Sequence, residues 1–280
     1  YELTGKEKYR LAIEKVRAQL DTHPRTSEGG FWHKKIYPWQ MWLDGLYMAQ
    51  PFYAEHTFRS DVAQQVKDSL YADCMNHFIV VADHCYDPST GLYRHAWDES
   101  REMFWCEPAT GQSQHAWGRA LGWYCMAVVE TLPFIPEGTP GRDRVLEIFR
   151  GIFDTLPKFA DPETGLWYQV LDRPGSEGNY LEATANAMFV YSMLKGVRLG
   201  YLDSGLRGDA EKLWKNFLAE FVSVDENSIV SLNRCCEVAG LGGKTMRSGT
   251  YEYYINEKIC SNDPKGIGPL IWAALEIERH

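Results

Sequence analysis

The sequence predicts an all-α fold in which helical hairpins stack side by side and curl into an α/α barrel. Two kinds of helical segment alternate along the 280 residues. One kind is amphipathic, as in 144–160 and 209–223, and the other is apolar on most sides, as in 183–197 and 267–278. An amphipathic helix belongs on the outside, whereas one that is apolar around its circumference belongs inside. The third observation is a loop pattern that recurs between the two kinds.

This loop pattern is clearest in two stretches of similar sequence. "DPSTGLYRHAWD" begins at Asp87 and "DPETGLWYQVLD" begins at Asp161, and less similar stretches begin at Arg25 and Asp225. Each loop separates an expected outer helix from an expected inner one, which gives a repeating unit of roughly 60–75 residues. Stacked hairpins of this kind bury their faces against their neighbours. We therefore expect residues 1–280 to form a single barrel domain.

The start of the chain reads as a loop entering an amphipathic helix. It begins with Tyr1 rather than Met and shows no signal-peptide pattern. The chain contains about four hairpin units, and a closed ring of six would need roughly another hundred residues. We therefore expect the N-terminal hairpins of the barrel to be missing from this chain. The compartment, cytoplasm or periplasm, stays open, because a signal would precede Tyr1.

Composition excludes several classes of partner. The net charge of −9 argues against nucleic acid and against anionic membrane surfaces. No apolar run reaches the roughly 18 residues of a membrane-spanning helix. The seven cysteines include no Cys-x-x-Cys pair, so we expect small core thiols such as Cys74, Cys85 and Cys125 and no metal or other cofactor. Ten Trp and sixteen Tyr suit either a helical core or a sugar-binding surface. The oligomeric state is not indicated.

Asp44 is the first candidate for chemistry. It lies in "WLDGLYMAQPF", an otherwise uncharged helical stretch that begins at Trp42. One interpretation is a carboxylate at a helix N-terminus, stabilised by free backbone N–H groups and the helix dipole. The other is a carboxyl group whose pKa is raised by an apolar surround, as a general acid requires. The neighbours Trp42, Tyr47 and Met48 favour the second.

Other polar and aromatic residues occur in the loops and first helical turns that a barrel would bring to one end. They are His33, Lys34, Lys35, Trp42, His95, Trp97, Trp117, Arg119 and Trp123. Arg119 lies between Trp117 and Trp123 in an otherwise apolar helix, where an arginine normally meets a fixed anion of the protein or of a ligand. The tryptophans either stack on a sugar ring or pack in the core. A purely structural interpretation is equally open for the remaining residues. The lysines would then belong to a solvated loop, and the histidines would be core residues whose hydrogen bonds are satisfied.

Several longer segments carry a resemblance to a known family. They are "FWHKK", "YPWQMWLDGLYMAQPF", "HAWDES", "WGRALGWY" and "SGTYEYYINEKICSNDPKGIGPLIWAALEIER". On these segments the chain, from about Thr4 to His280, resembles glycoside hydrolase family 105, the bacterial unsaturated rhamnogalacturonyl hydrolases, which are related to the family 88 unsaturated glucuronyl hydrolases. The resemblance implies an (α/α)6 barrel of six hairpins that works without a metal. It also implies a second active-site Asp, ahead of the matched segments, which this chain does not contain.

The resemblance assigns roles to individual residues. Asp44 would be the general acid/base that hydrates the C4=C5 double bond of an unsaturated uronic acid at the end of a lyase-generated pectin oligosaccharide. The residues that would line the pocket around this sugar are His33, Lys34, Trp42, His95, Trp117, Arg119 and Trp123. Three alternatives remain at this point. They are an unsaturated glucuronyl hydrolase for ulvan or glycosaminoglycan fragments, a sugar epimerase built on a His pair, and a non-catalytic carbohydrate-binding barrel fragment.

Overall fold

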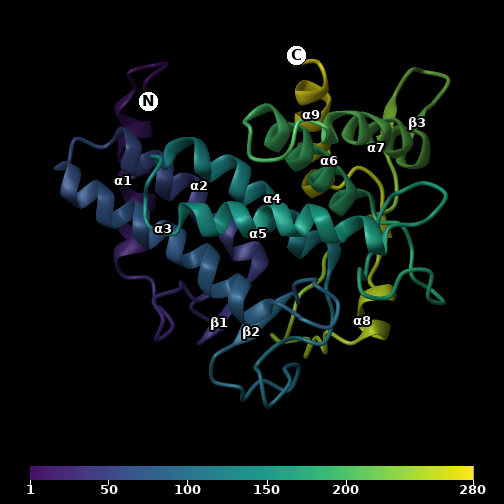
Figure 1. Ribbon diagram of the computed structural model, residues 1–280, viewed down its shortest axis with the longest axis horizontal. Helices are drawn as coiled ribbons and strands as arrows, with labels where there is room; N and C mark the ends of the chain where they lie inside the picture. The colour runs from purple at the N-terminus through teal and green to yellow at the C-terminus, as the bar shows by residue number, and fades with distance from the viewer. Residues whose placement is uncertain (280) are drawn as a thin grey trace.

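The computed structural model describes residues 1–279, whose long helices form two layers (Figure 1). Inner helices lie side by side in chain order: α2 (Leu43–Arg59), α4 (Gly118–Thr131), α6 (Ala183–Arg198) and α9 (Pro264–Ile277). Outer helices precede or separate them: α1 (Glu7–Asp21), α3 (Gln64–Cys85), α5 (Arg142–Thr155) and α7 (Leu206–Phe221). The predicted all-α fold and its alternation of outer and inner helices are confirmed.

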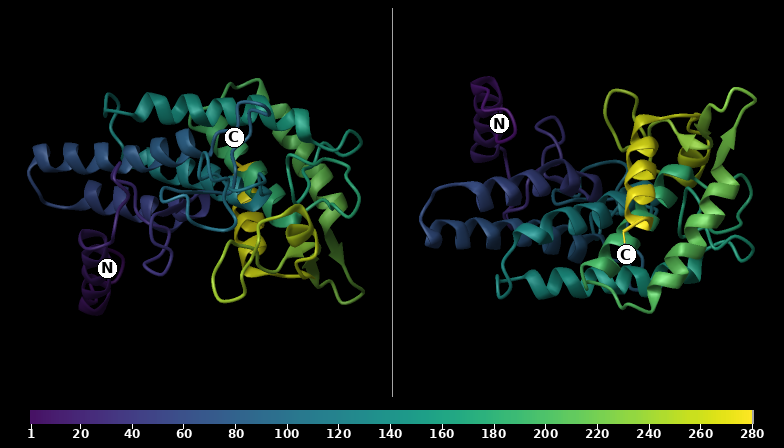
Figure 2. Two further views of the ribbon diagram at one scale, coloured as in Figure 1. Left: turned by 90° about the horizontal axis from the view of Figure 1, so that it is seen from below. Right: turned by 90° about the horizontal axis from the view of Figure 1, so that it is seen from above.

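The two layers differ in burial as the sequence patterns predict. The helix α6 buries every residue from Ala183 to Leu194, so its whole circumference is covered. Close packing of the inner helices depends on small residues. A Cβ atom at Gly122 of α4 would lie 2.9 Å from the Cβ of Met188 in α6, so any side chain there would force these helices apart. In contrast, α1 buries none of its residues and stands apart from the other helices in both views of Figure 2.

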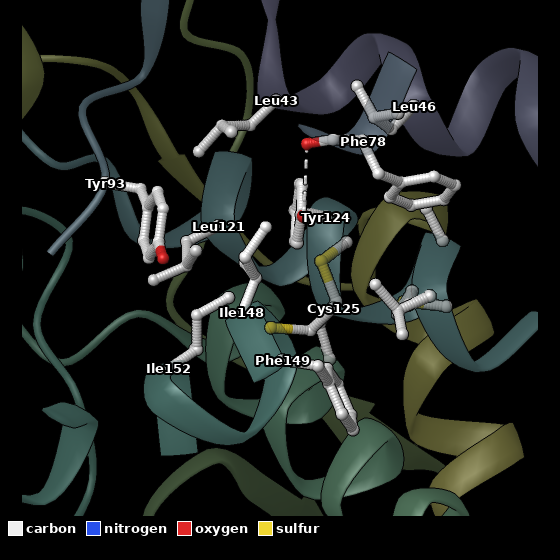
Figure 3. Packing of buried hydrophobic residues seen from close by; sticks show 14 of the residues in the cluster. Leu43, Leu46, Phe78, Tyr93, Leu121, Tyr124, Cys125, Ile148, Phe149 and Ile152 are labelled. Atoms are coloured by element: carbon white, nitrogen blue, oxygen red, sulfur yellow. Dashed lines mark hydrogen bonds between the residues drawn. The ribbon is translucent and has the colours of Figure 1, made fainter. Parts of the chain in front are cut away.

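The largest hydrophobic cluster joins the inner helices to the outer ones (Figure 3). Its centre is built from α2, α3, α4, α5 and one loop, with the side chains of Leu43, Leu46, Phe78, Tyr93, Leu121, Tyr124, Cys125, Ile148, Phe149 and Ile152. The hydroxyl of Tyr124 donates a hydrogen bond to the carbonyl oxygen of Phe78 at 3.3 Å, so its one polar group is satisfied. Cys74, Cys85 and Cys125 are buried, as predicted.

The repeated loops take the same turn. The backbone N–H of Asp87 donates to the carbonyl of Leu92 at 2.9 Å, and that of Asp161 donates to Leu166 at 2.8 Å. Each aspartate side chain accepts from the backbone N–H two residues on, which is an Asx-turn. The glycine four residues after each aspartate has a positive φ, 78° and 72° respectively. The sequence repeat is therefore a structural repeat.

Short strands and turns complete the chain. They are β1 (Gln40–Trp42) paired with β2 (Ala96–Asp98), β3 (Val222–Val224) with β4 (Val230–Leu232), β5 (Cys235–Cys236) with β6 (Ile259–Cys260), the short helix α8 (Tyr251–Ile255), and the 3-10 turns Leu132–Phe134 and Leu156–Phe159. The elements β1, β2 and α8 lie together on the lower side of Figure 1. No helix within residues 1–279 is both long and apolar enough to cross a membrane.

Candidate active site

Asp44 is placed by the join between β1 and α2. Trp42 ends β1 opposite Ala96 of β2, and the N–H of Leu43 donates to the carbonyl of His95 at 3.1 Å. Asp44 follows as the second residue of α2. This register brings Asp44 Oδ2 within 3.1 Å of Nε2 of His95, although the two residues are far apart along the chain. The Asp44 side chain is 14% exposed, whereas the His95 side chain is fully buried.

His95 connects Asp44 to a buried tyrosine. Its Nδ1 lies 2.7 Å from the hydroxyl of Tyr254 in α8. The ring is enclosed by Trp42, edge-on at 5.1 Å, and by Trp117 at 4.7 Å between ring centroids. The Nε2–Oδ2 contact with Asp44 has a hydrogen-bonding distance but poor N–H alignment, and neither atom has another partner within residues 1–279. Such contacts in substrate-free enzymes often tighten only when substrate is bound.

The pKa of Asp44 differs from the sequence-based expectation. Burial raises the pKa of Asp44, but the electrostatic interaction and close contact with His95, with a smaller effect of His33, outweigh it, and the net direction is below the ordinary value of 3.8. The prediction of a raised pKa is therefore wrong for the substrate-free protein. Met48 does not provide the expected apolar surround, because it is 61% exposed. His95 meets the carboxylate instead.

His33 approaches the same helix N-terminus from the preceding loop. Its ring stacks on Trp42 with centroids 4.1 Å apart and planes 6° apart, and Tyr37 stacks on Trp42 at 5.2 Å. A Cβ at Gly45 would lie only 3.2 Å from His33 Nδ1, so the glycine gives this ring its place. Burial lowers the pKa of His33 to about 3 against the opposing effect of Asp44, so the imidazole is neutral at physiological pH.

Lys34 lies on the rim rather than in the buried part of the group. Lys34 is exposed, like Lys35, and its ammonium lies 5.7 Å from the ring centroid of Tyr37. A different cation contacts the same tyrosine: Nη2 of Arg247 donates to the Tyr37 hydroxyl at 3.1 Å. Arg247 comes from the loop before α8, and the sequence analysis did not identify it.

Trp117 and Arg119 lie where α4 begins, beside His95. Trp117 is buried and its indole N–H donates to Oε1 of Gln169 at 3.1 Å. Arg119 is 2% exposed, its guanidinium lies 4.7 Å from the Trp117 ring, and Nη1 donates to the carbonyl oxygen of Cys236. Within residues 1–279, Arg119 forms no ion pair with a carboxylate. A buried guanidinium without a protein anion can bind the carboxylate of a ligand.

Trp123 lies deeper along the inner helices. It follows Arg119 by four residues, which is about one helical turn. Its ring lies 4.5 Å from that of Tyr47 in α2. The structure therefore brings Asp44, His33, Trp42, His95 and Trp117 together, places Arg119 against Trp117, and leaves Lys34 at the rim and Trp123 a turn below.

A cavity of about 210 Å³ adjoins this group on the side of α1. His33, Trp42 and Gly45 are part of its wall, and Asp44 is not. Four polar atoms of its lining residues are buried and have no hydrogen-bond partner in the described part of the chain: Trp32 Nε1, His33 Nδ1, Gln50 Oε1 and His77 Nε2. Within residues 1–279, His, Cys, Asp and Glu side chains nowhere gather in threes as a metal site would require.

Sequence reasoning missed three residues of this group: Tyr254, Gln169 and Arg247. Tyr254 lies in "YEYYINE", a segment that carries the family resemblance but for which no role in the site was predicted. Gln169 lies in the second of the two repeated loops, at the point where the first loop has His95. The alignment of Gln169 with His95 in the repeated loops could have identified Gln169 from the sequence. Arg247 lies in a glycine-rich loop with no distinguishing pattern.

One family model matches the whole chain, and several known proteins are similar to it. The model of glycosyl hydrolase family 88 matches residues 1–280. Protein Atu3128 of Agrobacterium fabrum is 39% identical over 195 residues, which are 66% of this chain and 82% of that protein. The unsaturated rhamnogalacturonyl hydrolase YesR of Bacillus subtilis is 30% identical over 210 residues, 71% of this chain and 55% of that protein.

Solved structures extend this likeness to the fold. A family 105 glycoside hydrolase from C. acetobutylicum is 44% identical and superimposes with a TM-score of 0.95 over 100% of this chain and 76% of its own. A heparin-specific unsaturated glucuronyl hydrolase superimposes with a TM-score of 0.68 at 13% identity, over 99% of this chain and 70% of its own, a likeness of fold alone. The predicted (α/α)6 barrel class is confirmed by these structures.

Proposed function

The chain belongs to glycosyl hydrolase family 88, and from this premise we propose that it removes the unsaturated uronic acid from lyase-cleaved rhamnogalacturonan oligosaccharides. The observation that carries the proposal is the contact of Asp44 with His95 at 3.1 Å inside a buried aromatic group. This contact orients the carboxyl group of Asp44, which is the proposed acid. The likeness to YesR, named an unsaturated rhamnogalacturonyl hydrolase, supports rhamnogalacturonan over other uronate polymers.

The proposed reaction is the hydration of an enol ether. A lyase leaves a C4=C5 double bond next to the ring oxygen and the carboxylate of the terminal sugar. Asp44 donates a proton to C4, and positive charge develops at C5, where the ring oxygen stabilises it. A water molecule adds to C5 and returns a proton to a base. The hemiketal that results opens, and the bond to the next sugar breaks as the hemiacetal at C1 collapses to an aldehyde.

The electrostatics of the group suit a proton that is taken up with the substrate. In the substrate-free protein, His95 holds the pKa of Asp44 low, so the carboxyl group is ionised. An arriving uronate brings a second negative charge close to Asp44, and a nearby like charge raises the pKa of a carboxyl group. The substrate itself therefore favours the protonated, donating form of Asp44. In this proposal the negative charge of the substrate, rather than an apolar surround, is the reason why Asp44 takes up its proton.

The remaining residues have roles in binding. Arg119, buried without a protein anion, would pair with the uronate carboxylate. Trp42 and Trp117 would exclude water and stack against the flat unsaturated ring. His33, neutral and with a free Nδ1, would hydrogen-bond a ring hydroxyl. Lys34 and Trp123 would act at the rim and the floor of the site.

The test is a substrate panel followed by ultraviolet absorbance of the conjugated double bond. We expect the absorbance to be lost fastest with unsaturated galacturonyl-rhamnose. Faster turnover of unsaturated glucuronyl disaccharides from ulvan or glycosaminoglycans would overturn the rhamnogalacturonan assignment. Loss of absorbance with none of the panel, in a folded protein that still binds the sugars, would favour a carbohydrate-binding barrel instead.

A further inference from the structure

Tyr254 lies at the far end of the chain of contacts that starts at Asp44. It is fully buried, and its hydroxyl lies 2.7 Å from His95 Nδ1. Neighbouring residues fix its position. Its backbone carbonyl accepts from Nε2 of Gln169 at 3.3 Å, and its ring stacks at 6.0 Å with Trp117. Tyr254 does not line the cavity beside the site, and within residues 1–279 its hydroxyl is hydrogen-bonded only to His95.

The direction of the Tyr254–His95 hydrogen bond follows from a count of acceptors. His95 Nδ1 is the one hydrogen-bond partner of the Tyr254 hydroxyl within residues 1–279. If Nδ1 carried the proton and donated it, the hydroxyl hydrogen of Tyr254 would be buried without an acceptor, which is costly. The tyrosine therefore donates and Nδ1 accepts. Burial keeps this donor protonated, because it raises the pKa of Tyr254 well above its ordinary range.

Once Nδ1 is an acceptor, the proton of a neutral His95 lies on Nε2. That nitrogen faces Asp44 Oδ2, an atom with no solvent contact and no other partner. In the substrate-free protein this contact is close but poorly aligned; once it tightens with substrate, Oδ2 accepts a hydrogen bond from His95 and an acidic proton of Asp44 has to reside on Oδ1. Because Oδ2 is buried, the exposed 14% of the Asp44 side chain lies on its other atoms, Oδ1 among them.

The opposite tautomer would have the reverse effect. A bare Nε2 would face Oδ2 and attract the acidic proton of Asp44 to that oxygen. The proton would then be held in the Asp44–His95 contact by Nε2. Correct orientation of a catalytic group by its neighbour's tautomer is worth large factors in rate in other enzymes.

We propose that Tyr254 is a positioning residue that fixes the Nε2–H tautomer of His95 and thereby keeps the acidic proton of Asp44 on Oδ1, the oxygen that does not face His95. The claim about the acidic proton of Asp44 rests on the proposed function. The claim that Tyr254 fixes the tautomer of His95 does not.

The first experiment is nitrogen-15 NMR of the histidine rings in the ligand-free protein at neutral pH. Long-range couplings distinguish Nε2–H from Nδ1–H, and the His95 signals are assigned from their loss in His95→Gln. We expect His95 to be in the Nε2–H form. In Tyr254→Phe we expect a mixture of tautomers or the Nδ1–H form. A wild-type His95 in the Nδ1–H form would overturn the proposal whether or not the variant folds.

The second experiment measures turnover in the same variants. Tyr254→Phe should lower kcat by roughly tenfold to a hundredfold, the range for loss of a residue that orients a catalytic group, and leave KM within about a factor of two, since the buried Tyr254 hydroxyl is hydrogen-bonded to His95. Tyr253→Phe is the matched control. Its hydroxyl accepts from the N–H of Gly240 at 3.1 Å and has no contact with His95. It should leave both kcat and the tautomer unchanged.

The two experiments separate failure of this proposal from failure of the proposed function. A wild-type protein that turns over no unsaturated disaccharide would count against the function, and the tautomer spectra would still decide the role of Tyr254. A Tyr254→Phe variant with the wild-type tautomer, or with unchanged kcat in an active enzyme, would show that the tyrosine only packs.

Discussion

Arg119 and Glu182 hold the backbone of the same residue, Cys236, from opposite sides. Arg119 donates to the Cys236 carbonyl, and Glu182 accepts from the Cys236 N–H at 2.8 Å. Glu182 also accepts from the N–H of Ala185 at 2.7 Å and so caps α6. Two buried and opposite charges are therefore joined through one residue of β5 rather than by a direct ion pair. This arrangement fixes the guanidinium without neutralising it, and two predictions depend on it.

The first prediction is that Arg119→Met loses substrate affinity without losing stability. Removal of a buried charge that lacks an anion is favourable and offsets the cost of leaving the Cys236 carbonyl without its donor, so the free energy of unfolding should change by less than about 1 kcal/mol. The affinity for an unsaturated disaccharide should fall by about tenfold to a hundredfold, the range for loss of one charged hydrogen bond. Calorimetric titration and urea denaturation measure the two effects. Arg144→Met, on the exposed face of α5, is the control and should change neither. Unchanged affinity would remove Arg119 from uronate binding.

The second prediction concerns Glu182→Gln, which should destabilise the protein by about 1–3 kcal/mol. The carboxylate accepts from two backbone N–H groups, whereas the glutamine side chain has one oxygen and would direct its NH2 group at one of them. Urea denaturation at neutral pH measures the loss. Glu147→Gln, at an exposed position of α5, should leave the stability within about 0.5 kcal/mol. Equal stabilities of the two variants would show that water satisfies the backbone groups near α6.

The third prediction is that Asp44→Asn abolishes turnover but keeps binding. The amide has no acidic proton to give to C4, so kcat should fall by at least roughly a thousandfold, near the upper range for general acid catalysis. The affinity for the disaccharide should stay within a few-fold, because the side chain keeps its shape. Asp83→Asn, on the outer helix α3, is the control for loss of one carboxylate. A near-normal rate in Asp44→Asn would remove Asp44 from the mechanism.

The helical alternation was predictable because it depends on local pattern. The apolar circumference of α6 and the amphipathic faces of α5 and α7 are present in the sequence itself. The repeated turn at Asp87 and Asp161 was equally readable, since an Asx-turn uses residues only two to four apart. Helix α1 is the exception. Its amphipathic pattern predicted a packed outer helix, yet it buries no residue within the described chain.

The site was predictable in its members but not in its electrostatics. Sequence spacing showed Tyr47 and Met48 as the neighbours of Asp44 and so suggested a raised pKa. The actual neighbour is His95, which the β1–β2 register brings across, and the direction of the pKa shift reverses. Contacts set by strand register and by loops such as that of Arg247 are not encoded in helical periodicity. Tyr254 was hidden for the same reason.

The fourth prediction tests the close approach of Gly45 and His33. A Cβ at Gly45 would lie 3.2 Å from His33 Nδ1, so Gly45→Ala should displace the imidazole from its stack on Trp42. We expect KM to rise by a few-fold, and the gain of about 0.5–1 kcal/mol that alanine gives in a helix to be absent. Gly151→Ala in α5, where a Cβ meets nothing within 4 Å, should show that gain. Thermal denaturation and steady-state kinetics compare the two. An equal gain at both positions would mean that His33 moves aside without consequence.

The fifth prediction is that acidification destabilises the protein through His77. Its Nδ1 lies 2.7 Å from the carbonyl oxygen of Asp73 and so donates to it, while Nε2 is buried beside the ring of Phe31 and has no partner among residues 1–279. Burial lowers the pKa of His77 from 6.5 to about 4. Between these two values the unfolded chain binds a proton that the folded protein does not, so this contribution to stability is present above pH 6.5 and is lost as the pH falls towards 4. The loss should approach about 1.4 kcal/mol per pH unit at the steepest part of this range. Urea denaturation at several pH values should show a shallower dependence for His77→Gln than for the wild type. Parallel curves for the two proteins would mean that His77 is protonated in the folded state as readily as in the unfolded chain.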